Sequence, residues 1–113
     1  MLVVDDDETI RKFVRTALEK RGWTVLEAED GVDGTARCIL HSPDVLLTDI
    51  SMPKGDGLEM LEVLRAGVFL DDVHVVIMSG VLGVDDSKLK NTPAAAFLSK
   101  PFSLQGLYTA VGA

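Results

Sequence analysis

The chain has 113 residues, a length that suits one compact domain and leaves no room for a second. With 47% hydrophobic and 26% charged residues, it belongs with globular chains and not with disordered ones, which lack apolar side chains to bury. The formal net charge of -7 opposes contact with a phosphate backbone and disfavours nucleic acid as a direct ligand.

Apolar runs alternate with helical periods along the first half of the chain. Residues 2–4 and 25–28 are predicted to form strands, and the helix after the first strand ends near Gly22. A turn at Asp30 and Gly31 leads into a second helix, which must end before Pro43. The apolar residues of these helices are Ile10, Phe13, Val14, Ala17 and Leu18 in the first, and Val32, Ala36, Ile39 and Leu40 in the second.

The second half of the chain repeats this pattern. Residues 45–48 form an apolar run typical of a strand covered by helices on both faces, and Asp49 follows it. Gly57 opens the next helix, residues 73–78 form a fourth strand, and residues 85–91 form a weak helix. Residues 95–99 form a fifth strand, and Ser103 caps a last helix. These units predict a (βα)5 fold, a doubly wound parallel five-stranded sheet of the α/β class.

Polar residues follow four of the predicted strands. They are the acids at 5–7, Asp49, the pair Ser79 and Gly80, and Lys100. Because ligands of open α/β sheets bind beyond the carboxyl ends of the strands, we expect these groups to converge. Each has a plainer explanation taken alone: helix capping for the acids, a turn for the Ser-Gly pair, and a solvated cation for the lysine. Their joint occurrence favours a functional site.

The predicted set of groups suits phosphoryl chemistry. Crowded carboxylates repel one another unless a cation lies among them, and an all-oxygen site suits Mg2+. A Mg2+ held by few protein oxygens has positions left for a phosphoryl oxygen, while a lysine and a hydroxyl can hold the others. A carboxylate oxygen is itself a competent nucleophile for phosphorus and gives an aspartyl phosphate.

Four segments resemble the receiver domains of the two-component response regulator family, and together they span essentially the whole chain. They are LVVDDD at residues 2–7, LLTDISMPKGDG at 46–57, VIMSG at 76–80 and FLSKPF at 97–102. The resemblance implies a flavodoxin-like sheet with strand order 2-1-3-4-5. It also implies a phosphoprotein of phosphorelay signal transduction that is no enzyme, except toward its own phosphorylation and dephosphorylation. We expect one receiver domain over residues 1–113, trimmed at its ends or excised from a longer protein.

At matched positions, the resemblance implies that Asp49 accepts the phosphoryl group from a histidine kinase or phosphotransfer protein. Asp6, Asp49 and the backbone carbonyl of Ser51 would hold Mg2+, and Asp5 would act through a water on the metal. Lys100 would pair with the acyl phosphate, or with Asp49 when no phosphoryl group is present.

The resemblance also implies a switch. Ser79 would bond a phosphoryl oxygen and move toward it, Gly80 would leave space for the donor, and Phe97 would turn inward. The altered face, made by helix 4, strand 5 and helix 5, would meet an output partner, a fused output domain or a second copy in a dimer. A core position is the alternative for Phe97, since aromatic residues in strands are more often buried. The family further suggests a cis bond before Pro101, and an apolar Val81 predicts slow to moderate self-dephosphorylation.

Two other functions remain open. The segment VVDDDET at residues 3–9 also resembles the signature of haloacid dehalogenase-type phosphatases, with Asp5 as nucleophile and Ser79 in a second motif. The chain is short for the fold of those phosphatases. That function would also give the loop after Asp49 no role. The other alternative is a receiver-like adaptor that binds partners without phosphorylation, and the complete acceptor set argues against it.

Cysteine usage and hydropathy bear on location. The single cysteine, Cys38, cannot form an internal disulfide, which removes the main reason to assign an oxidising compartment. No stretch approaches the roughly 20 apolar residues of a membrane span. We therefore expect a cytoplasmic protein that makes no membrane contact.

Overall fold

The computed structural model describes residues 1–50, 57–80 and 94–112, which form nine helices and strands. The strands are β1 Leu2–Val4, β2 Leu26–Ala28, β3 Val45–Asp49, β4 His74–Ser79 and β5 Ala96–Ser99. The helices are α1 Glu8–Glu19, α2 Gly31–His41, α3 Gly57–Ala66 and α5 Leu104–Val111. The helix predicted at residues 85–91 lies outside the described residues.

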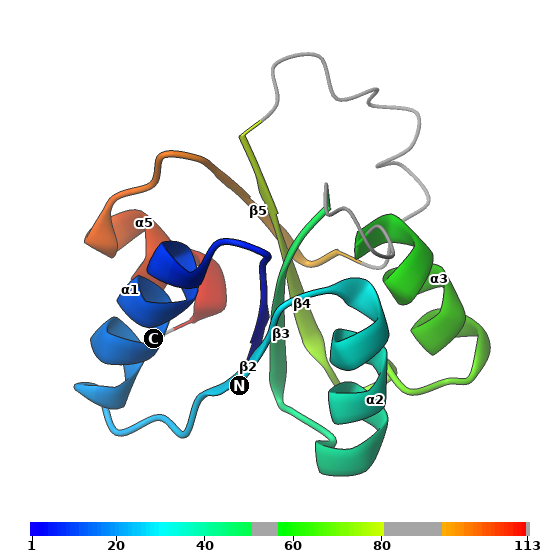
Figure 1. Ribbon diagram of the computed structural model, residues 1–113. Coiled ribbons are helices and arrows are strands. Elements are labelled where there is room, and N and C mark those ends of the chain that lie inside the picture. The colour runs from blue at the N-terminus through cyan, green and yellow to red at the C-terminus, as the bar shows by residue number, and fades with distance from the viewer. Residues whose placement is uncertain (51–56, 81–93, 113) are drawn as a thin grey trace.

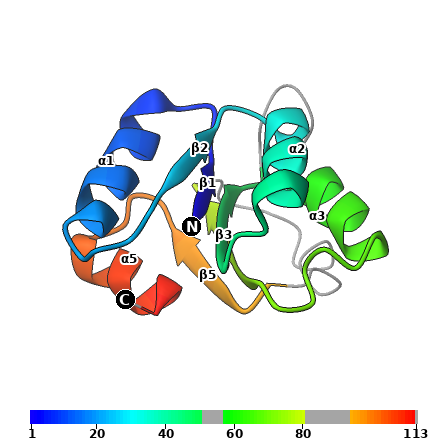
Figure 2. The ribbon, with the colours of Figure 1, turned by 90° about the horizontal axis from the view of Figure 1, so that it is seen from below.

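All five strands are parallel and lie in the order β2-β1-β3-β4-β5. Helices α1 and α5 cover one face of the sheet, and α2 and α3 cover the other (Figures 1 and 2). The predicted doubly wound sheet and its strand order are confirmed. The strand bounds differ from the predicted ones by about one residue, and Asp49 is the last residue of β3.

Alternation along the strands feeds a separate core on each face of the sheet. Val3, Leu47 and Val76 pack with the buried residues of α1 and α5. On the other face, Leu46 and Ile77 pack with the buried residues of α2 and α3. Burial on both faces explains why the central strands are apolar without interruption.

Capping side chains begin the helices that flank the site. Asp7 accepts a hydrogen bond from the backbone N–H of Thr9 at 2.9 Å and begins α1. Ser103 accepts one from Gly106 at 2.9 Å and begins α5, as predicted. Such caps pair backbone donors that have no partner within the helix. No helix in the described parts of the chain combines the length and apolarity needed to cross a membrane.

Helix α2 does not bury the apolar residues that its sequence groups on one face. Its buried residues are Gly31, Gly34 and Cys38, while Val32 and Leu40 are 70% and 77% exposed. A Cβ on Gly34 would lie 2.7 Å from the Met60 sulfur and 3.0 Å from a methyl of Val4. Small residues therefore seat α2 close to the sheet, and its larger apolar side chains face outward.

Candidate functional site

The register of the sheet brings the predicted site residues to one edge. Val4 pairs with Thr48, so Asp5, which follows β1, and Asp49, which ends β3, lie side by side. Ser79 pairs with Ser99 at the ends of β4 and β5, and Lys100 follows directly. The carboxyl ends of four strands thus bring together the acids, the hydroxyl and the amine, as predicted from the chain order.

Lys100 bridges two carboxylates from different strands. Its Nζ donates to Oδ2 of Asp5 at 2.7 Å and to Oδ2 of Asp49 at 3.0 Å. The Asp5 side chain has no exposed surface, that of Asp49 is 10% exposed and that of Lys100 is 18% exposed. The predicted pairing of Lys100 with Asp49 is present, and Asp5 shares the same cation.

The pKa of Lys100 reflects this environment. Burial alone would lower the pKa, because the charged form loses hydration. The hydrogen bonds and negative charges of Asp5 and Asp49 outweigh burial and raise the pKa above its ordinary value of 10.5. Lys100 is therefore firmly cationic at neutral pH.

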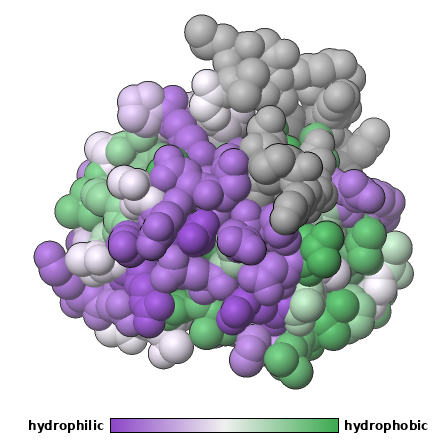
Figure 3. All heavy atoms as spheres, viewed as in Figure 1, coloured by the Kyte–Doolittle hydropathy of each residue, from purple (hydrophilic) through white to green (hydrophobic). Residues whose placement is uncertain are grey.

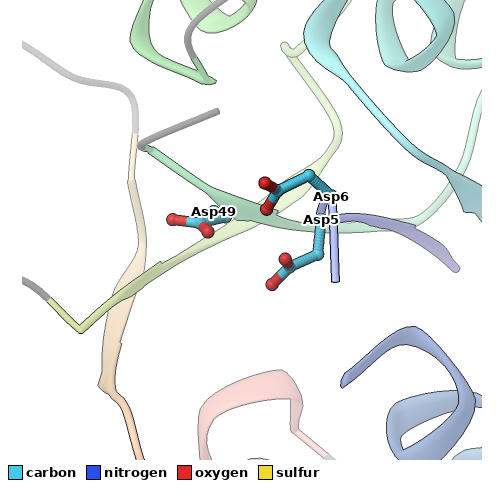
Figure 4. Close-up of side chains that lie close together, drawn as sticks. All are labelled: Asp5, Asp6 and Asp49. Atoms are coloured by element: carbon cyan, nitrogen blue, oxygen red, sulfur yellow. The ribbon is translucent and has the colours of Figure 1, made fainter. Parts of the chain in front are cut away.

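Asp5, Asp6 and Asp49 form a cluster that could hold a cation. One ligand oxygen from each lies within 4.8 Å of the others. Asp6 is exposed, while Asp5 and Asp49 are buried, and Figure 4 shows the three carboxylates gathered at the ends of β1 and β3. An oxygen-only donor set with one open side fits a hard cation such as Mg2+, which keeps part of its water shell. Ser51, whose carbonyl was predicted as a further ligand, lies outside the described residues.

The surroundings of Asp5 bear on the phosphatase alternative. Its Oδ1 accepts from the backbone N–H of Asp7 at 2.9 Å, and its Oδ2 is bound by Lys100. Arg11 also donates to the backbone carbonyl of Asp5 at 2.6 Å. A nucleophile must reach its substrate, and a fully buried carboxylate with both oxygens hydrogen-bonded is poorly placed for that role.

Ser79 and Gly80 lie beside Lys100 at the end of β4. The backbone N–H of Lys100 donates to the carbonyl of Ser79 at 2.8 Å, and the Ser79 side chain is half-buried. A Cβ on Gly80 would lie 3.3 Å from the Cβ of Lys100, so Gly80 keeps the space over the lysine stem open. Val81, on which the expected rate of self-dephosphorylation depends, lies outside the described residues.

Phe97 and Pro101 belong to the segment around Lys100. Phe97 is 56% exposed on β5, an edge strand, in register with Ile77. An outward aromatic does not fit the alternative of a core position. The peptide bond between Lys100 and Pro101 is cis, as predicted.

Two residues that touch the site were not singled out from the sequence. Gly57 begins α3 so close to β3 that a Cβ on it would overlap the backbone carbonyl oxygen of Asp49. Arg11 binds the carbonyl of Asp5 and pairs with Glu27 at 3.2 Å, which ties α1 to the ends of β1 and β2. From the sequence, Gly57 had a place as a helix start and as the last residue of a matched segment, but no predicted contact with the site. A local sequence pattern gives no signal for a contact between a helix and a strand.

An apolar hollow of about 520 Å3 lies next to Lys100 and Gly80. Its other lining residues are Thr9, Ile10, Phe13, Pro101 and Phe102. The rings of Phe13 and Phe102 meet at 5.9 Å between centroids, which joins α1 to the segment after β5. Phe13 is 44% exposed and lies in this hollow, not in the core face predicted for its helix.

A doubly wound sheet with a carboxylate cluster and a lysine at its carboxyl edge defines a domain of the receiver class. The model of the response regulator receiver domain matches residues 1–112, and the chain belongs to this family. It is thus a receiver domain of two-component response regulators, a signalling domain.

Known relatives support this assignment. The chain is 36% identical over 106 residues to the KDP operon transcriptional regulatory protein KdpE of Escherichia coli, covering 92% of this chain and 45% of that protein. It is 32% identical over 114 residues to protein PilG of Pseudomonas aeruginosa, covering 100% and 84%. The structure of the Francisella response regulator 1452 receiver domain matches with a TM-score of 0.86 at 31% identity, covering 98% of this chain and 91% of that one. The chain spans about half the length of the first curated relatives it matches.

Proposed function

We propose that Asp49 is the phosphoacceptor of this receiver domain. The observation that carries the proposal is the shared cation: Lys100 holds Asp49 and Asp5 together at 3.0 and 2.7 Å beside the exposed carboxylate of Asp6. A phosphoryl group brought to this edge would meet a nucleophilic oxygen, a lysine and a cluster able to hold a cation. Asp49 ends β3 at the point where all three converge.

The proposed step is a phosphoryl transfer from a phosphohistidine. A carboxylate oxygen of Asp49 attacks phosphorus, the P–N bond breaks, and the imidazole leaves with the bonding electron pair and gains a proton. Lys100 pairs with the developing charge on the phosphoryl oxygens, Ser79 donates a hydrogen bond, and Gly80 leaves room for the donor.

We propose that Asp6 and Asp49, with the carbonyl of Ser51, hold Mg2+, and that Asp5 contributes through a bound water. When bound, the ion neutralises charge on the phosphoryl oxygens and offsets the repulsion between them and the carboxylates. Asp6 has the exposed position that suits exchange of such an ion with solvent, while Asp5 stays bound to Lys100.

A histidine kinase or phosphotransfer protein is the proposed donor, and the apolar hollow is its proposed contact. The hollow adjoins Lys100 and Gly80, so a helix whose histidine enters the site would cover Phe13 and Phe102. Burial of aromatic side chains beside a polar target is the usual composition of an interface centre. Residues 1–113 are proposed as one receiver domain that acts through an output partner or a fused output domain.

We propose Ser79 and Phe97 as the switch. Ser79 is half-buried at the end of β4, and Phe97 is exposed on the neighbouring strand β5, so both have room to move. The face made by helix 4, β5 and α5 would carry the signal, including dimer formation; helix 4 lies outside the described residues.

Reductive trapping of the acyl phosphate tests the acceptor. The chain would be incubated with acetyl phosphate and Mg2+ and reduced with borohydride, which releases the phosphate and leaves homoserine at the acceptor position as a label that mass spectrometry can map. We expect label on Asp49, lost in Asp49→Asn and on removal of Mg2+. Asp71→Asn, in an exposed loop, is the matched control and keeps the label.

Label on Asp5 would refute the proposal in favour of the phosphatase alternative. An unlabelled wild type whose partner binding is unchanged in Asp49→Asn would favour the adaptor. Before reduction, slow to moderate loss of the phosphoryl group without added phosphatase is the expectation that follows from Val81.

A further inference from the structure

Arg11 holds the backbone between the two acids that follow β1. Its Nη1 donates to the carbonyl oxygen of Asp5 at 2.6 Å, a short charge-assisted hydrogen bond. The carbonyl of Asp5 and the N–H of Asp6 belong to one planar peptide unit, so a fixed carbonyl also fixes the direction in which the backbone enters Asp6. Arg11 therefore acts on the part of the chain that carries Asp6 into the acid cluster.

The carboxylate of Asp6 is held differently from the other two in the cluster. Asp5 is bound by Lys100 and by the backbone N–H of Asp7, and Asp49 is bound by Lys100. Both of these acids are buried, whereas Asp6 is exposed. An exposed side chain has few packing contacts, so its direction depends mainly on the backbone that carries it. A shift of the peptide before Asp6 would move its oxygens away from the cluster.

The start of α1 explains how Arg11 reaches this peptide. Asp7 caps the helix, and the backbone N–H of Arg11 donates to the carbonyl of Asp7 at 3.1 Å, which places Arg11 at the end of the first turn. Side chains on a helix lean toward its N-terminus. A long side chain at this position therefore reaches back over the loop that joins β1 to α1.

Glu27 on β2 orients the guanidinium group of Arg11. Its Oε1 accepts from Nε of Arg11 at 3.2 Å, and the side chains of Arg11 and Glu27 are 15% and 24% exposed. A planar guanidinium can bind a carboxylate and a carbonyl at once through different N–H groups, and a lysine ammonium does not reproduce this fixed geometry. The pair has no net charge, so its repulsion of a cation at the acid cluster is small.

The surroundings of this pair are polar. Figure 3 shows hydrophilic side chains across the middle of the view, between α1 and α2. A hollow of about 260 Å3 adjoins the pair, and its lining residues are Arg11, Glu27, Ala28, Glu29 and Asp33. Helix α1 packs on the sheet through other side chains, among them Val14 and Leu18, which have no exposed surface. The bond from Arg11 to Asp5 thus adds to an apolar contact that already holds the helix.

We propose that Arg11 is a positioning residue for Mg2+ binding: through the carbonyl of Asp5, it keeps the carboxylate of Asp6 directed at the ion. This role rests on the proposed Mg2+ site at Asp6 and Asp49. Groups that orient a metal ligand without touching the metal contribute roughly 10- to 100-fold to metal affinity. Arg11 contacts neither the ion nor the phosphoryl group, and its effect passes through the backbone.

The sign of the effect separates positioning from charge. Replacement of Arg11 by Met removes a positive charge near the acids, and by Coulomb's law that loss alone would tighten the binding of a dication. Loss of the hydrogen bond to Asp5 frees the peptide before Asp6 and weakens binding. A role confined to holding α1 on the sheet would lower stability and leave the affinity for Mg2+ unchanged.

Titration of the isotope-labelled chain with MgCl2, followed by two-dimensional NMR without a phosphoryl donor, measures this affinity and reports the fold of each variant. We expect Arg11→Met to raise the dissociation constant for Mg2+ about tenfold. Arg11→Lys, a milder variant that keeps the charge, should give a smaller rise. The matched control is Arg15→Met: Arg15 also pairs with Glu27, at 3.1 Å, but it is 48% exposed and lies one turn further along α1. Its dissociation constant should stay within about twofold of the wild type.

A double-mutant cycle shows whether Asp6 transmits the effect. In an Asp6→Asn background, Arg11→Met should change the dissociation constant by less than about twofold, because the ligand that Arg11 positions is already lost. A tenfold effect that persists in this background would overturn the positioning role. Binding of Mg2+ by both Arg11 variants as tightly as by Arg15→Met would also overturn it.

These outcomes are distinct from a failure of the proposed function. A wild-type chain that binds no Mg2+ would refute the proposed metal site and the role of Arg11 with it. A chain that binds Mg2+ but takes no label on Asp49 would refute the proposed acceptor alone, because the titration contains no phosphoryl donor.

Discussion

Replacing Lys100 with Met should destabilise the fold at neutral pH. The change removes the cation that binds Asp5 and Asp49 and leaves two buried carboxylates near each other. Removal of one partner from a buried ion pair costs about 3–5 kcal/mol. Because the Lys100 side chain is 18% exposed, we expect the low end, about 3 kcal/mol, and a fall in melting temperature of roughly 10 °C.

Urea unfolding followed by circular dichroism measures this change. In a double-mutant cycle with Asp5→Asn, the two substitutions should couple by about 2 kcal/mol, since the atoms lie 2.7 Å apart. Lys12→Met is the control: Lys12 pairs with Glu8 at 3.1 Å, but both side chains are about two-thirds exposed, and the loss should stay within about 0.5 kcal/mol. Equal effects of the two lysine variants would refute the reasoning.

Three further outcomes follow from the same geometry. The pKa of Lys100 is 10.5 in the unfolded chain and higher in the folded chain, so the stability that its charge contributes is fully present below pH 10.5 and should be lost as the pH rises through the folded pKa. The urea concentration at the midpoint of unfolding should therefore fall over that pH range in the wild type and not in Lys100→Met. Gly57→Ala should lower the free energy of unfolding by about 2 kcal/mol or more, because the added Cβ overlaps the backbone carbonyl of Asp49. The same displacement should slow phosphorylation of Asp49, and stopped-flow labelling with acetyl phosphate would measure that rate. Burial raises the pKa of the Cys38 thiol, so its reaction with a disulfide reagent should be about 100-fold slower in the native chain than in urea. A rapid reaction in the native chain would contradict the place of Cys38 on the buried side of α2.

The sequence predicts the sheet well because continuous apolar runs, joined by short turns to helical segments, are compatible with only one arrangement, a parallel sheet covered by helices. Runs such as residues 45–48 must be covered on both faces, which requires helices between parallel strands. The meeting of Asp5, Asp49 and Lys100 follows from the same parallel order, since strand ends share an edge. The bridge from Lys100 to Asp5 was not predicted, because the reach of a lysine between two acids depends on register and rotamer.

The orientation of α2 could not be predicted from its apolar period. The spacing of Val32, Ala36 and Leu40 indicates a helix face and does not say which face meets the sheet. Close approach at Gly34 decides that, and it depends on Met60 and Val4, which are distant in the chain. Periodicity identifies the apolar face, and packing decides whether it is core or surface.

A single lysine shared by three strands offers a physical route from the proposed chemistry to the surface. The Lys100 backbone donates to Ser79 on β4, while its side chain binds Asp5 after β1 and Asp49 on β3. A phosphoryl group on Asp49 would add an acceptor with nearly two negative charges, and charge-assisted bonds favour the more charged acceptor. Nζ would then be drawn from Asp5 toward the phosphoryl oxygens, and this pull would act on β4 and β5, where the backbone of Lys100 joins them. Phe97 lies on β5, three residues before Lys100, so a displacement of the end of this strand would move the exposed aromatic side chain directly.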